Sequence, residues 1–244
     1  TLWGDAADVD LEIIRTRGDV DRQSLSQIGG QGVFTREIEN ALLDGRIDLA
    51  VHSLKDLPTE MDSRLQLAAV PEREDVRDVL VTRDGGDLEA LAEGARVGTG
   101  SARRQAQLAM QRPGLRFVDL RGNVDTRLRK VHDGEAEAVV LAAAGLHRLS
   151  LQDRISQYLD PLAILPAPGQ GALGLQMRAD ATEKQAFVAA LDDAETHTSV
   201  TAERTFLASL GGGCRAPIAA WGRAHEDGLR VDGMVSRPDG TDPC

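Results

Sequence analysis

Paired arginines behind glycine-rich turns are the residues whose types and spacing are best suited to chemistry in this sequence. In residues 97–104, Thr99 and Ser101 precede Arg103 and Arg104. Backbone N–H groups and hydroxyls at the start of a helix suit the binding of an oxyanion. Arginines in the first helical turn lie at the positive end of the helix dipole, which is unfavourable unless an anion neutralises their charge. Because guanidinium groups bind carboxylates through two hydrogen bonds, this turn predicts a carboxylate or phosphate site. A merely capped helix is the alternative.

A second turn, in residues 119–127, repeats this arrangement. Arg121 follows a predicted strand, a Gly-Asn turn comes next, and Arg127 lies one turn into the following helix. Asn123 would also cap that helix, which is the simpler explanation of its presence. Together the two turns indicate a ligand with several carboxylates.

Lys55 and Asp56 form a charged pair directly after a short apolar strand. Ligands of α/β sheets bind at the carboxyl ends of strands, so this pair brings a cation and a carboxylate to that edge. Asp56 is suited to accept a hydrogen bond from a substrate N–H and to stabilise positive charge on a ring. The alternative is a surface pair in a turn that ends at Pro58.

A lone cysteine lies on a loop of three glycines, with Arg215 beside Cys214. A flexible loop and an adjacent cation favour an exposed thiolate that can hold a group covalently, and a chance loop cysteine is the alternative. The five histidines are scattered, and no His/Cys pair has the spacing of metal ligands. We therefore predict no metal site.

Charge is unevenly distributed along the 244 residues, whose formal net charge is −11. Residues 96–130 hold nine basic and two acidic side chains, so this segment is +7 and the rest is −18. An acidic chain is a poor general binder of nucleic acid or membrane surfaces, whereas a local basic segment indicates a site for a small polyanion. No apolar run is long enough to span a bilayer, and two cysteines are too few for a disulfide scaffold. We expect a cytoplasmic protein.

The predicted elements alternate between strands and helices, which indicates an α/β architecture with a largely parallel sheet. Strands are expected at 11–16, 47–51, 95–98, 115–120 and 138–142. Helices are expected at 35–43, after the strand at 95–98 as far as about 111, from about 124 to Gly134, at 181–191 and at 200–210. The tail has short alternating stretches that predict antiparallel strands, so a separate C-terminal module is expected from about Ala194.

Several of these motifs, in this order, resemble the hydroxymethylbilane synthase family, also called porphobilinogen deaminase. The resemblance covers essentially the whole chain. Its signatures are residues 29–34 with Glu37, 52–58, 98–105, 120–128, 143–149, 165–171, and 202–204 before 212–214. Any one of them is weak, and the ordered set is specific.

The resemblance implies an enzyme that joins four porphobilinogen molecules head to tail, with release of ammonia, into the linear tetrapyrrole hydroxymethylbilane. A dipyrromethane cofactor would be attached to Cys214 through a thioether. The implied fold has two periplasmic-binding-protein-like α/β domains around a cleft and a small α+β C-terminal domain. These correspond to residues 1–72 with 172–190, to 77–166, and to 194–244, with the first expected to be incomplete at its N-terminus and the third at its C-terminus.

The resemblance also implies roles for individual residues. Asp56 would be catalytic, holding pyrrole N–H groups and stabilising azafulvenium-like intermediates. Cofactor binding would involve Cys214, Lys55, Ser53, Thr99, Ser101, Arg103, Arg104 and Gly145. Substrate binding would involve Phe34, Arg121, Arg127 and Arg148. We expect a monomer that acts on porphobilinogen and binds neither nucleic acid nor membrane. A non-catalytic carboxylate-binding protein and an inactive synthase relative are the rival hypotheses.

Overall fold

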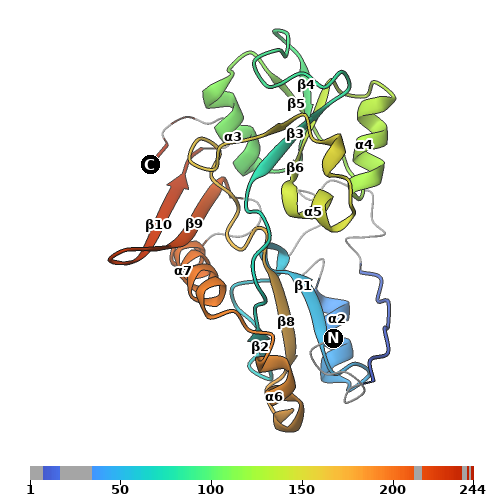
Figure 1. Ribbon diagram of the computed structural model, residues 1–244, viewed down its shortest axis with the longest axis vertical. Helices are drawn as coiled ribbons and strands as arrows, with labels where there is room; N and C mark the ends of the chain where they lie inside the picture. The colour runs from blue at the N-terminus through green and yellow to red at the C-terminus, as the bar shows by residue number, and fades with distance from the viewer. Residues whose placement is uncertain (1–7, 17–34, 212–215, 238–240, 242) are drawn as a thin grey trace.

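The computed structural model describes residues 8–16, 35–211, 216–237, 241 and 243–244. Figure 1 shows two lobes joined by extended segments, with a long helix and a β-hairpin beside them. Residues 70–77 and 159–172 are the segments that run between the sheets of the two lobes. The chain therefore crosses from one lobe to the other and returns, which places both segments next to any site between the lobes.

The first lobe is built on a three-stranded sheet in the order β1 (Ala50–Ser53), β8 (Leu173–Arg178), β2 (Leu65–Ala69). Both pairings are antiparallel, and the first runs in register from Ala50 opposite Gln176 to Ser53 opposite Leu173. Helices α2 (Arg36–Leu43) and α6 (Thr182–Ala189) pack on this sheet. The short 3-10 helix η2 (Leu54–Asp56) follows β1 directly, so the sheet fixes the position of the charged turn.

The second lobe has five strands in the order β5 (Arg116–Val118), β4 (Arg96–Gly98), β6 (Ala138–Ala142), β3 (Asp78–Thr82), β7 (Gln157–Tyr158). Its helices are α3 (Ala102–Gln111), α4 (Val124–His132), α5 (Ala143–Arg148) and the 3-10 helix η3 (Gln152–Arg154). Strand β3 is buried on both faces, which is typical of a strand with helices on both sides of its sheet. Val79 packs in one core cluster with Leu128 and Leu146, and Leu80 packs in the other with Leu108.

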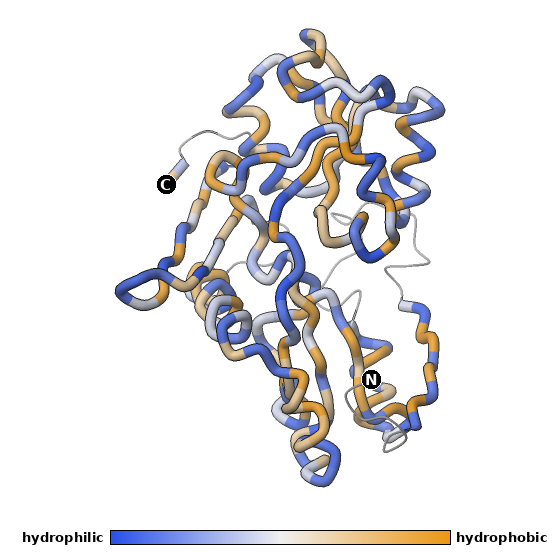
Figure 2. The backbone as a smooth tube through the Cα atoms, in the orientation of Figure 1, coloured by the Kyte–Doolittle hydropathy of each residue, from blue (hydrophilic) through white to orange (hydrophobic). Residues whose placement is uncertain are grey.

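The central strands of this second lobe consist mainly of apolar residues, as the hydropathy colouring of Figure 2 shows. The helices around them alternate between polar and apolar residues, because one side of each faces the sheet and the other faces solvent. The caps fix where two of these helices begin. The Ser101 hydroxyl accepts the N–H of Arg104 at 3.4 Å, and the Asn123 side chain accepts the N–H of Thr126 at 3.0 Å.

The C-terminal part consists of α7 (Ala194–Ser209) and a hairpin of β9 (Ile218–His225) and β10 (Gly228–Val235). The hairpin is antiparallel, with Gly228 opposite His225 and Val235 opposite Ile218. The carboxylate of Asp193 caps α7 by accepting the N–H of Thr196 at 2.8 Å. The expected helix and antiparallel strands of this region are thus confirmed, and the helix begins several residues earlier than predicted.

The α/β fold class is confirmed, with two corrections. Residues 11–16 form no strand; Leu11 and Ile13 are each 91% exposed, so their alternating pattern has no core to face. Within the described ranges the sheets are not largely parallel, because only β4 with β5 and β4 with β6 pair in parallel there. Strand β3 enters the second sheet from the crossing segment and lies antiparallel to β6.

Candidate functional site

The charged turn after β1 is held by buried apolar contacts beneath it. Leu54 is fully buried, and its N–H donates to the carbonyl of Ala172 on the returning segment at 3.0 Å. The N–H of Leu57 closes the turn on the carbonyl of Leu54 at 3.1 Å. Lys55 and Asp56 are therefore presented at the end of β1, and Ser53 lies exposed just before them.

Charges from both lobes act on the Asp56 carboxylate. It reaches solvent, yet desolvation by the protein around it raises its pKa, against the opposing effect of Lys55, Arg127, His52 and Arg104. Desolvation likewise lowers the pKa of the Lys55 ammonium, and Asp56 opposes that change. Lys55 and Asp56 belong to the first lobe, whereas Arg104 and Arg127 belong to the second. The structure thus brings together charged turns that are far apart in sequence.

The first arginine turn already contains an anion of its own. Arg103 and Arg104 are 4% and 6% exposed, and both pair with the fully buried carboxylate of Asp78. Two arginines at the positive end of a helix dipole led us to expect an anion beside them, and the protein itself supplies one in Asp78. Buried Thr99 accepts the N–H of Ser101 through its hydroxyl at 3.2 Å. The binding of a cofactor by these residues stays a prediction.

The second arginine turn is more open. Arg121 pairs with Asp119 at 3.1 Å, and Nε of Arg127 donates to the carbonyl of Gly122 at 2.7 Å. Desolvation, with the positive charge of Arg104 adding to it, lowers the pKa of the Arg127 guanidinium. A bound anion would stabilise the charge of a guanidinium that is desolvated and close to another cation, which is the property expected of a carboxylate site.

The two remaining described residues predicted for the site lie on α5. At Gly145, an added Cβ would meet Val124 at an ordinary 3.7 Å, so packing alone does not demand glycine. Arg148 donates to the carbonyl of Gly171 at 2.8 Å and borders a cavity of about 430 Å³ with Glu72, Arg73, Glu74 and Leu173. Arg148 therefore contacts the crossing segments. Phe34 and Cys214 lie outside the described residues.

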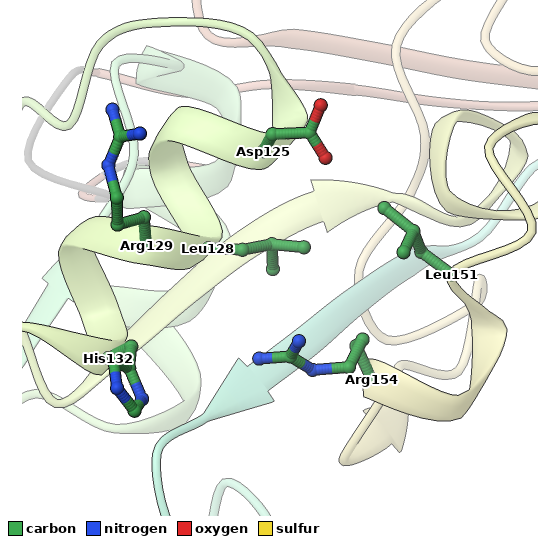
Figure 3. A pocket seen from close by; sticks show the side chains of 6 residues that line it. All are labelled: Asp125, Leu128, Arg129, His132, Leu151 and Arg154. Atoms are coloured by element: carbon green, nitrogen blue, oxygen red, sulfur yellow. The ribbon is translucent and has the colours of Figure 1, made fainter.

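Another cavity, of about 330 Å³, lies between α4 and the segment that follows α5 (Figure 3). Leu128 and Arg154 point toward one another across it. Its full lining is Asp125, Leu128, Arg129, His132, Leu151 and Arg154. None of the predicted site residues is among these, so we do not place the substrate there.

Two buried polar residues were missed by the sequence analysis. Asp78 holds both arginines, and Gln170 donates to Asp78 at 2.8 Å. Aspartate is uncommon in a buried strand, so its position at the start of the apolar run 78–82 was the signal available. Gln170 has no such signal within its Pro/Gly-rich segment.

Two further properties concern only the described part of the chain. It contains no group of three or more His, Cys, Asp or Glu side chains arranged to hold a metal ion. No helix in it combines the length and the apolar composition needed to cross a membrane.

Comparison with known proteins gives consistent matches over most of the chain. Residues 2–186 match the model of the porphobilinogen deaminase dipyromethane cofactor binding domain, and residues 197–243 match that of the porphobilinogen deaminase C-terminal domain. A porphobilinogen deaminase of Syntrophobacter fumaroxidans is 47% identical over 233 residues, covering 95% of this chain and 75% of the relative. One of Roseiflexus sp. is 51% identical over 234 residues, covering 95% and 77%. Among solved structures, the periplasmic VFT2 domain of Bordetella pertussis BvgS is 19% identical with a TM-score of 0.40, covering 70% and 71%.

Proposed function

This chain belongs to the porphobilinogen deaminase family, and on that premise we propose that its charged turns assemble a linear tetrapyrrole around Asp56. The family membership makes it a transferase of tetrapyrrole biosynthesis that uses a dipyrromethane cofactor. It joins four porphobilinogen molecules head to tail and releases ammonia at each addition. No observation favours a non-catalytic carboxylate-binding protein or an inactive relative.

The observation that carries the proposed site is that cations of both lobes act electrostatically on the Asp56 carboxylate at the end of β1. Positive charge develops on a pyrrole ring as ammonia leaves, and a fixed carboxylate beside the ring stabilises that charge. The same carboxylate accepts a hydrogen bond from the pyrrole N–H, which orients the ring. Because desolvation raises the pKa of Asp56, its ionised form interacts more strongly with a cation than an aspartate in bulk water would.

The cations around Asp56 suit the cofactor that the family uses. Lys55, Arg104 and Arg127 each lower the pKa of this carboxylate through their positive charge, and guanidinium and ammonium groups suit the carboxylate side chains of a dipyrromethane. When attached to Cys214, the cofactor supplies the pyrrole end to which substrate units are added. We propose that Lys55 and Arg104 hold its carboxylates and that Arg127 receives those of the incoming unit.

The remaining roles follow the same division. Thr99 and Ser101 supply hydroxyl and backbone groups at the head of α3, Arg103 acts with Arg104, and Ser53 and Gly145 leave room beside the cofactor. Arg121, Arg148 and Phe34 bind substrate. We propose domains of residues 1–72 with 172–190, 77–166 and 194–244, in a cytoplasmic monomer. The two lobe sheets and the α7–hairpin unit support this division.

A matched pair of aspartate substitutions tests the proposal. Asp56→Asn removes the charge at the site, whereas Asp62→Asn removes a carboxylate of the same lobe that pairs with exposed Arg64. Removal of a group that stabilises developing charge costs roughly 100–1,000-fold in turnover. We expect that loss in Asp56→Asn and wild-type release of hydroxymethylbilane in Asp62→Asn. Equal turnover in the two variants would exclude the role given to Asp56.

A further inference from the structure

Asp78, the first residue of β3, is a buried carboxylate to which the roles above assign nothing. Its side chain is fully buried beside the first turn of α3. An ionised group in such a place requires close partners, because the burial of an unpaired charge is far more costly than that of a neutral polar group.

Two guanidinium groups share this carboxylate. Nη1 of Arg103 lies 2.8 Å from Oδ2, and Arg104 donates to Oδ1 from Nη2 at 2.7 Å and from Nε at 3.1 Å. Although burial alone would raise it, the two guanidinium groups hold the pKa of the Asp78 carboxyl well below its usual range. Two cations therefore share one anion, and one net positive charge is left to attract a bound carboxylate.

Gln170 fixes the orientation of the shared carboxylate. It is 1% exposed, and its Nε2 donates to Oδ1 of Asp78 at 2.8 Å and to the carbonyl of Val76 at 2.7 Å. Its backbone carbonyl in turn accepts from Nε of Arg73 at 2.8 Å. Val76 and Arg73 lie on one crossing segment and Gln170 on the other. The anion that holds both arginines is thus attached to both connections between the lobes.

We propose that Asp78 and Gln170 are positioning residues that hold Arg103 and Arg104 at the head of α3 and thereby set where the carboxylates of the bound pyrrole chain lie. Asp78 and Gln170 act through the guanidinium groups and do not contact the bound pyrrole chain. This inference rests on the proposed function, in which the arginines bind carboxylates. It makes the orientation of that binding surface depend on the crossing segments, which connect to the lobe that carries Asp56.

The test compares two hydrogen-bonded glutamines of the second lobe and its crossing segment. Gln170→Met removes the side-chain hydrogen bonds to Asp78, to the carbonyl of Val76 and from Nη2 of Arg103, and it leaves the two ion pairs. Gln157→Met is the matched control, because Gln157 lies in β7 of the same lobe and its side chain accepts the N–H of Leu88 at 2.8 Å, away from both arginines. Two readouts are measured: KM and kcat for porphobilinogen, and the hydrogen exchange of the Arg104 Nε–H by ¹⁵N NMR, assigned with Arg104→Lys.

We expect Gln170→Met to raise KM about tenfold, as befits a lost hydrogen bond to a charged group, and to speed exchange of the Arg104 Nε–H. Gln157→Met should leave both values at those of the wild type. Equal KM and equal exchange in the two variants would overturn the inference. If the wild type fails to convert porphobilinogen, the proposed function fails, and the exchange rates alone still decide whether Gln170 positions Arg104.

Discussion

Glu203 of α7 is a fully buried carboxylate on which the attachment of the C-terminal part depends. Its carboxylate accepts hydrogen bonds from Nη1 and Nη2 of Arg73 at 2.7 and 3.0 Å, from the N–H of Gly169 at 2.6 Å and from the N–H of Gly222 at 2.7 Å. Arg73 and Gly169 lie on the two crossing segments, and Gly222 lies in β9. One side chain therefore joins both crossing segments to the hairpin.

Glu203→Gln keeps the shape of this side chain and removes its charge. The Arg73 side chain, only 10% exposed, then has no anion opposite it, and the new amide N–H₂ faces groups that are themselves donors. Breaking a buried ion pair by removal of one partner costs about 3–5 kcal/mol. We therefore expect the free energy of unfolding to fall by about 3–5 kcal/mol, which is a large fraction of the stability of a typical domain.

Urea denaturation of Glu203→Gln and of Asp48→Asn measures this difference. Asp48 pairs with Lys184 at 2.7 Å, but their side chains are 57% and 56% exposed. Exposed pairs contribute at most about 1 kcal/mol, so the control should unfold close to the wild-type midpoint. A loss of less than about 1 kcal/mol in Glu203→Gln would refute the argument from burial.

Three further predictions concern pH, a crossing turn and a helix cap. Desolvation raises the pKa of Asp56, and its ionised form is the active one, so turnover should already decline with falling pH at pH values above 3.8, the ordinary pKa of an aspartate. Because a raised pKa means that the folded state disfavours the charged form, urea unfolding at pH 7 should show Asp56→Asn to be no less stable than the wild type. Gly171→Ala should lower the free energy of unfolding by at least about 1–3 kcal/mol in the same assay, because its φ is +86° and an added Cβ would overlap the carbonyl oxygen of Glu74. Asn123→Ala should cost about 1 kcal/mol by calorimetry, because it leaves the N–H of Thr126 without its cap.

Local signals in the sequence were sufficient for the elements that carry the arginine turns. Ser101 and Asn123 cap α3 and α4 where the predicted helices begin, and the apolar run 138–142 is β6. Such signals depend on residues within a few positions of one another, so a single sequence contains them.

Pairing between distant segments was not accessible in the same way. Strands β3 and β8 follow the crossing segments, and their orientation depends on which sheet they join. The partners of Asp78 lie 25 and 26 positions away, at Arg103 and Arg104, and Gln170 lies 92 positions away. The arginines were therefore predicted to face only a ligand, whereas the fold also supplies an internal anion.

Intact-protein mass spectrometry of the purified chain, with Cys214→Ser as its partner variant, tests most directly whether this site builds a tetrapyrrole. The wild type should carry the added mass of two linked pyrrole units and should gain further units on brief exposure to porphobilinogen. The variant should show the bare mass in both conditions. A wild-type chain that shows the bare mass before and after exposure to porphobilinogen would contradict the proposed function.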